Sequence, residues 1–211
     1  GSNLLRGGVE TIRVAALRRD GWTGPIAVTV GGLPDGVTCG PAIMAANQNT
    51  VQLTLVADVE AAAWSGPLEV LGRPAGAAEE APRRAVPATV VRGETGGMEL
   101  DARLSVELLQ AVSGKDVAPL LVELGEGDEI EAKRGSTVKV PIRLTRRDGG
   151  KEAVLLRPRD LPPGVSAPEV TAPAEATEFS IDVSIAGGAP LGAYTFWLQG
   201  ETGVTRATNP Q

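Results

Sequence analysis

Few side chains in this sequence could take part in covalent or metal chemistry. The chain of 211 residues has no histidine and a single cysteine, Cys39. A nucleophile of the Ser-His-Asp or Cys-His type needs an imidazole to accept its proton, and transition-metal sites mostly use histidine or several cysteines. We therefore expect no catalytic residue, no metal site and no cofactor. We interpret Cys39 as a small, partly buried thiol.

Carboxylates and lysines are the remaining candidates for chemistry. Paired carboxylates can cleave glycosides without histidine, but the Glu-Thr-Gly triplets at Glu94 and Glu201 occupy different places relative to the repeat described below. No serine is placed to form a dyad with a lysine. A calcium site is conceivable in an acidic cluster that lacks the D-x-D-x-D-G spacing and that we interpret as a solvated loop. Its members are Glu123, Glu126, Asp128, Glu129 and Glu131.

Tryptophans beside arginines offer a different kind of site. Trp22 lies close to Arg18 and Arg19 in a turn, and Trp64 lies in a second loop. Exposed aromatic faces can stack on sugars, so these four residues are candidates for a polysaccharide-binding surface. The alternative is that Trp22 covers the end of the core, and we favour it because large aromatic side chains are mostly buried.

The overall composition indicates a globular chain with an aliphatic core. Hydrophobic residues make up 42% and charged residues 22%, whereas only 3% are aromatic. The net charge of −6 and the lack of a basic run with aromatics argue against nucleic-acid binding. No apolar run reaches the length of a membrane span, so we expect no direct insertion into a membrane.

An internal repeat in the sequence indicates which structural elements position these residues. A shift of 128 residues places Arg18-Arg19-Asp20-Gly21 on Arg146-Arg147-Asp148-Gly149. It also places Leu33-Pro34 and Gly36-Val37 on Leu161-Pro162 and Gly164-Val165. One offset that explains separate matches predicts two copies of one structural unit.

Within each copy, the apolar residues alternate with polar ones. Val51, Leu53 and Leu55 are separated by Gln52 and Thr54, a period-two pattern that predicts a strand with one face in a core and one in water. In the same way, Trp197 is expected on the opposite face from Phe196 and Leu198. The expected strands are near residues 9–17, 25–31, 50–58, 66–72, 83–91, 100–112, 118–124, 136–145, 151–157, 177–185, 192–200 and 203–208.

Turn signals fall between these strands at regular spacing. Leu-Pro-x-Gly-Val predicts a proline-initiated turn with a positive φ at its glycine. Many short strands per 100 residues are typical of immunoglobulin-like sandwiches. We therefore predict an all-β chain of two tandem immunoglobulin-like antiparallel β-sandwiches, over residues 1–114 and 115–211, with a junction at 114–118.

The pattern resembles tandem bacterial immunoglobulin-like or fibronectin type III-like modules, and is most similar to the NPCBM-associated module of secreted multidomain proteins. The resemblance rests on the strand before Arg-Arg-Asp-Gly, on Leu33–Val37 and Leu161–Val165, and on the glycines at Gly66 and Gly192. It implies a non-catalytic module of a periplasmic or secreted protein, with no shared site residues. We expect a spacer or protein-interaction scaffold, whose partners are neighbouring domains, with a protein or a polysaccharide as a further candidate. The alternative is a carbohydrate-binding module that uses the loop tryptophans.

Overall fold

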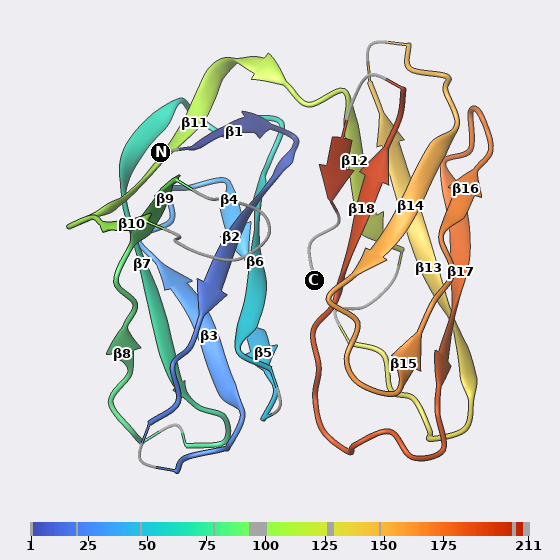
Figure 1. Cartoon of the computed structure of the whole chain (residues 1–211). Coiled ribbons are helices and arrows are strands. Elements are labelled where there is room, and N and C mark those ends of the chain that lie inside the picture. Colours follow the sequence, from blue (N-terminus) through green and yellow to red (C-terminus); the bar gives the residue numbers. More distant parts are fainter. Residues whose placement is uncertain are drawn as a thin grey trace.

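The chain is all-β in a computed structural model (Figure 1). The structure describes residues 2–19, 21–46, 48–77, 79–92, 101–125, 129–147, 149–203 and 206–208, and no helix occurs in these ranges. Asp20, Glu94, Glu126, Asp128 and Asp148 lie outside the described residues. The all-β prediction is therefore confirmed for the part of the chain that is described.

Within the described residues, the strands from Ser2 to Val117 pair into sheets only with one another, and we call this part the N-terminal half. The sheets are β1-β11-β7-β3-β5, with β8 also on β7, then β2-β6-β4, and the separate ribbon β9-β10. The strands are β1 (Ser2–Arg6), β2 (Val9–Ala15), β3 (Ile26–Gly31), β4 (Val37–Cys39), β5 (Ala42–Met44), β6 (Thr50–Ala57), β7 (Trp64–Pro74), β8 (Arg83–Arg84), β9 (Ala88–Arg92), β10 (Asp101–Leu104) and β11 (Leu108–Val117).

The strands from Leu120 to Thr208 form the C-terminal half, beside the first in Figure 1. Two four-stranded sheets, β12-β13-β17-β15 and β16-β14-β18-β19, make up this half. The strands are β12 (Leu120–Leu124), β13 (Thr137–Arg146), β14 (Val154–Arg159), β15 (Val165–Ser166), β16 (Val170–Ala172), β17 (Glu178–Ile185), β18 (Trp197–Glu201) and β19 (Arg206–Thr208).

The chain crosses between sheets in the same order in both halves. After β3, strand β4 pairs with β6 in the opposite sheet, and β5 then returns to pair with β3. In the C-terminal half, β15 likewise pairs with β17 before β16 returns to β14. The first strands differ, because β1 pairs with β11 whereas β12 pairs with β13.

The turns that start these crossings have the expected backbone geometry. Gly36 has φ 76° and Gly164 has φ 77°, which confirms the positive φ predicted for Leu-Pro-x-Gly-Val. The N–H groups of Val37 and Val165 donate to the carbonyls of Pro34 and Pro162, at 3.1 and 3.0 Å. Two further pairs of glycines that are 128 residues apart share a positive φ, Gly7 with Gly135 and Gly21 with Gly149.

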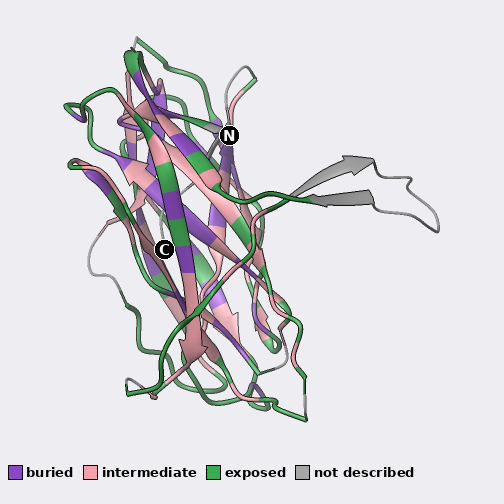
Figure 2. Cartoon of the chain, turned by 90° about the vertical axis from the view of Figure 1, so that its left-hand side faces the viewer, coloured by how far each residue is buried: buried purple, intermediate pink, exposed green. Residues whose placement is uncertain are grey.

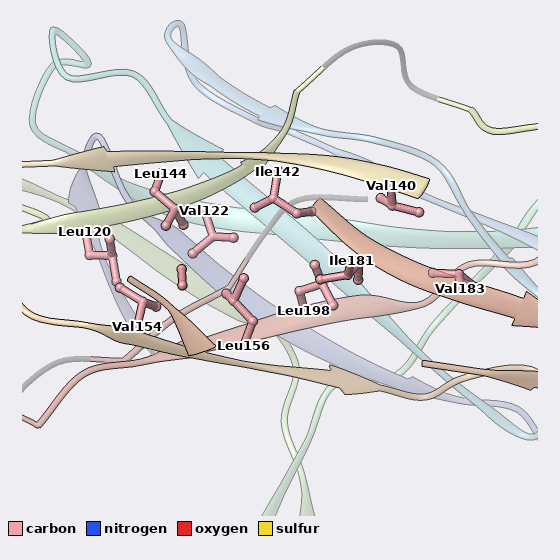
Figure 3. Close-up of a cluster of buried hydrophobic side chains, with 11 residues drawn as sticks. Leu120, Val122, Val140, Ile142, Leu144, Val154, Leu156, Ile181, Val183 and Leu198 are labelled. Atoms are coloured by element: carbon pink, nitrogen blue, oxygen red, sulfur yellow. The ribbon is translucent and has the colours of Figure 1, made fainter. Parts of the chain in front are cut away.

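Aliphatic side chains fill the interior of each half, as the composition predicts. Residues from both sheets of the C-terminal half form one core (Figure 3), in which Leu156 and Leu198 are fully buried. Two neighbouring clusters fill the N-terminal half, one around Leu55 and Leu68 and one around Val28 and Met44. Buried and exposed bands alternate along many strands in Figure 2.

The period-two prediction is confirmed for β17 and is wrong in part for β6. In β17, Ile181 and Val183 are buried while Ser180 and Asp182 are exposed. In β6, Thr54 on the expected water face is only 2% exposed. The sheet that contains β6 lies on the side next to the C-terminal half, where β2 contacts β19 (Figure 1), so this face is not open to water.

Several strand boundaries differ from the expected ones. The expected strands 83–91 and 100–112 are each broken, by Ala85–Pro87 and by Ser105–Glu107, and the ribbon β9-β10 stands between the breaks. The expected strand 192–200 begins only at Trp197. The expected junction is shorter as well, because residues 114–117 belong to β11 and leave only Ala118 and Pro119 between the halves.

Candidate functional site

The loop between β2 and β3 carries three of the four residues expected to form a ligand surface. Arg18 and Trp22 lie together, because the guanidinium carbon of Arg18 is 5.8 Å from the centre of the Trp22 ring. This distance is within the range of a cation–π interaction. Trp22 is 39% exposed, and Arg19 is exposed. The turn itself is held by the N–H of Trp22, which donates to the carbonyl of Arg19 at 3.2 Å.

Arg18 points into its own half and binds backbone carbonyls. Its Nη2 donates to the carbonyl of Ala45 at 2.7 Å and of Gly24 at 3.5 Å, and its Nη1 donates to the carbonyl of Gln48. These acceptors belong to two loops at the same end of the sheet, so Arg18 joins the loops together. Because its Nη1 and Nη2 groups are bonded to these carbonyls, they are not free to donate hydrogen bonds to a ligand.

Arg146 makes the same set of contacts in the C-terminal half. Its guanidinium donates to three carbonyls, those of Ala176 at 3.0 Å, Glu152 at 2.6 Å and Pro173 at 3.4 Å. Each acceptor lies 128 residues beyond an acceptor of Arg18. The first arginine of the Arg-Arg-Asp-Gly motif therefore has one structural task in both halves, which its position before a turn did not reveal.

Trp64 lies apart from Trp22. It begins β7, whereas Pro74 at the other end of β7 pairs with Ile26, next to the loop of Trp22. The Trp64 side chain packs against the core cluster of Leu68 and lies over Gly66, where an added Cβ would be 2.5 Å from the ring. The structure therefore does not bring the two tryptophans into one platform, and the polysaccharide-binding hypothesis stays a prediction that rests on Trp22.

The other residues considered for chemistry occupy separate places. Trp197 donates from Nε1 to Asp160 at 2.8 Å, and Leu198 beside it is fully buried in the core. Burial raises the pKa of the Cys39 thiol to about 11, although a backbone hydrogen bond from Thr54 acts in the opposite direction. At neutral pH Cys39 is therefore a thiol rather than a reactive thiolate. Among the described residues, no group of three acidic or cysteine side chains could hold a metal ion.

The second arginine of the motif has different surroundings in the two halves. Arg19 is exposed, whereas Arg147 is half-buried and reaches the N-terminal half. The Nη1 of Arg147 donates to the carbonyl of Gly7 at 2.7 Å and to that of Ala118 at 2.9 Å. Arg147 therefore joins the turn between β1 and β2 to the link between the halves.

The link itself is held by its backbone. The N–H of Ala118 donates to the carbonyl of Arg6, and the N–H of Arg147 donates to that of Pro119, both at 2.8 Å. A further bond between the halves runs from the N–H of Ile43 to the Oγ1 of Thr195, at 3.0 Å. The two halves therefore meet through directed polar contacts at separate places.

A shallow depression of about 440 Å³ lies at the start of β13 in the C-terminal half. It is lined by residues 135–137, 164–166 and 184–186, and none of these side chains is titratable. The depression can accept hydrogen bonds but offers no group for acid or base chemistry.

Comparisons with known proteins do not assign a family or a function to the chain. No protein-family model matches the chain, and no curated protein matches it. No helix in the described ranges combines the length and the apolar character needed to cross a membrane.

Proposed function

We propose that the chain is a non-catalytic pair of tandem immunoglobulin-like β-sandwiches that serves as a spacer or protein-interaction scaffold in a larger extracytoplasmic bacterial protein. Three similarities between the halves support the tandem organisation. The chain crosses between the sheets in the same order, glycines with positive φ occupy equivalent positions, and Arg18 and Arg146 bind equivalent carbonyls. The boundary that fits these observations lies between Val117 and Leu120. The bacterial and extracytoplasmic setting rests on the resemblance to NPCBM-associated modules.

The short, bonded link between the halves is the observation that supports a spacer. Ala118 and Pro119 are bonded on both sides, and Arg147 contacts both the link and Gly7. Flexible linkers instead leave their backbone groups to water and let the domains reorient. A pair of sandwiches held in this way keeps its neighbours at a constant distance.

The distance between the halves can be measured directly. In a Cys39→Ala background, spin labels at Glu60→Cys and Ser180→Cys report on one exposed site in each half. We expect a single narrow distance distribution by pulsed electron paramagnetic resonance. Arg147→Ala combined with Thr195→Val should broaden it, because both contacts between side chains and backbone are then lost.

Arg19→Ala is the matched control, because Arg19 holds the same place in the motif but is exposed. It should leave the distribution narrow, and circular dichroism should show that all variants keep their strands. A wild-type distribution as broad as that of a chain with a flexible insertion after Ala118 would refute the spacer function.

A further inference from the structure

The contact between the halves has two sides, and each has an uncovered equivalent elsewhere in the chain. On one side, Arg147 lies over Gly7, where an added Cβ would be 2.7 Å from the guanidinium. Next to it, Ala118 lies over Gly8 at the same distance from an added Cβ. Gly7 and Gly8 are both buried as a result.

The equivalent positions, 128 residues away, are open. Arg19 corresponds to Arg147 and is exposed, and Gly135 corresponds to Gly7 and is exposed. Gly135 and Ser136 line the depression of about 440 Å³. These two residues are the equivalents of Gly7 and Gly8, which Arg147 and the link cover in the N-terminal half.

We propose that the Arg19 loop of one copy of this chain docks on the Gly135 turn of a second copy, in the way that Arg147 docks on Gly7. The occupant is a second copy because this chain already carries both complementary surfaces, and one of them is already bound in the same manner inside it. The inference rests on the equivalence of the halves in the proposed function.

The local charges permit this contact. In the N-terminal half, the charge of Arg6 next to Gly7 does not prevent Arg147 from bonding to Gly7. By analogy, the charge of Arg134 next to Gly135 should not prevent the approach of Arg19. Lys133 adds a positive charge where the N-terminal half has Leu5, and Glu131 lies nearby with the opposite sign. We expect weak association, because the contact between copies lacks the effective concentration, about millimolar, that a short tether provides.

The two surfaces lie at the same end of each copy. The loop between β2 and β3 and the start of β13 both lie at the end of the molecule away from the β11–β12 junction (Figure 1). Each copy thus has one surface of each kind, and the junction is not involved. Two copies can therefore bind each other reciprocally, so that the contact of the Arg19 loop with the Gly135 turn occurs twice in one closed dimer.

Cysteine cross-linking between two variants tests the pairing without removing Arg19. In a Cys39→Ala background, Thr23→Cys lies in the Arg19 loop and Ser166→Cys lies in the depression, both at exposed positions. One chain carries a size tag, so that mixed and unmixed dimers separate on a gel. We expect the mixed dimer to dominate after oxidation, and a chain with both cysteines to form a doubly linked dimer.

Arg19→Ala in the Thr23→Cys chain should lower the yield of the mixed dimer about tenfold, which corresponds to the loss of one charge-assisted hydrogen bond. Arg83→Ala, which removes another exposed arginine of the same half, should leave the yield unchanged. An unchanged yield with Arg19→Ala, or a dominance of dimers between identical cysteines, would overturn the proposal. A narrow distance between the halves without any mixed dimer would refute this contact and leave the spacer function standing.

Discussion

At the scale of single residues, two adjacent arginines of one motif do different work. Arg18 and Arg146 face inward and bind three carbonyls each, whereas Arg147 faces the other half and Arg19 faces solvent. A single arginine can bind several carbonyls because the N–H donors of its planar guanidinium point in fixed, different directions. A pair of like charges in the sequence is therefore not simply a solvated patch.

Removal of Arg18 should destabilise the chain, whereas removal of Arg19 should not. Arg18→Ala deletes hydrogen bonds from a charged group to three carbonyls, so we expect a loss on the order of 2 kcal/mol in the free energy of unfolding. Arg19→Ala should change it by less than about 0.5 kcal/mol, as exposed substitutions do. Urea denaturation of the two variants measures the difference, and equal effects would contradict the role given to Arg18.

Cys39 gives the chain a pH dependence at alkaline pH. Burial raises the pKa of its thiol from 9.0 to about 11, so the folded state favours the protonated form. The stability from this preference is complete below pH 9 and is lost as the pH rises towards 11. The difference in unfolding free energy between wild type and Cys39→Ala should shrink over that window. A difference that stays constant from pH 8 to 11 would show that the thiol is not shifted.

At the scale of elements, alternation located most of the long strands and glycine located the turns, although the expected strand 192–200 begins only at Trp197. The long strands β2, β3, β6, β13 and β17 are close to their expected ranges. The short strands β1, β4, β5, β15 and β16 were not predicted, because two to five residues are too few to show a period. Their pairing depends on the crossing between sheets, which is a tertiary property.

The candidate site was predictable only where its parts are neighbours in sequence. Arg18 and Trp22 lie in one loop, and the structure brings them together. Trp64 was placed with them because of its residue type, but β7 separates it from their loop. The contact of Arg147 with Gly7 spans 140 residues, and the only sequence signal for it was the repeated arginine pair.

Alanine substitutions at two glycines of the C-terminal half can distinguish the cost of backbone strain from the cost of steric overlap. Gly164 and Gly149 both have a positive φ, but a Cβ on Gly164 would lie 2.9 Å from that of Ala189, whereas Gly149 has open space. Gly149→Ala should cost roughly 1–2 kcal/mol from the left-handed backbone alone. Gly164→Ala should cost more, because Ala189 is buried and cannot easily move. Thermal unfolding of both variants measures this, and equal losses would contradict the overlap.

At the scale of the whole molecule, the core clusters of the two halves are separate, and hydrogen bonds join one half to the other. No hydrogen-bonded sheet in the described residues includes strands from both halves. Each half therefore owes its stability mainly to its own aliphatic interior, while Arg147, Thr195 and the link connect the two halves. We therefore expect substitutions at these contacts to change the orientation of the halves more than the stability of either half.

The parallel pairing of β1 with β11 has a consequence for a molecule under tension. The first and last strands of the N-terminal half are bonded side by side, from Ser2 with Gln110 to Arg6 with Val117. A pull on the two ends of this half loads those bonds in shear, so that they must break together. In the described part of the C-terminal half, the first strand β12 and the last strand β19 belong to different sheets and do not pair with each other.

Stretching single molecules in a force spectrometer should therefore give two steps, with the C-terminal half extending first and the N-terminal half at the higher force. Asn3→Pro removes a backbone donor from β1 and should lower only the second force. A single step, or a high force that survives Asn3→Pro, would refute the clamp. A tether with one yielding and one resistant half lengthens in stages and keeps a folded anchor while it absorbs load.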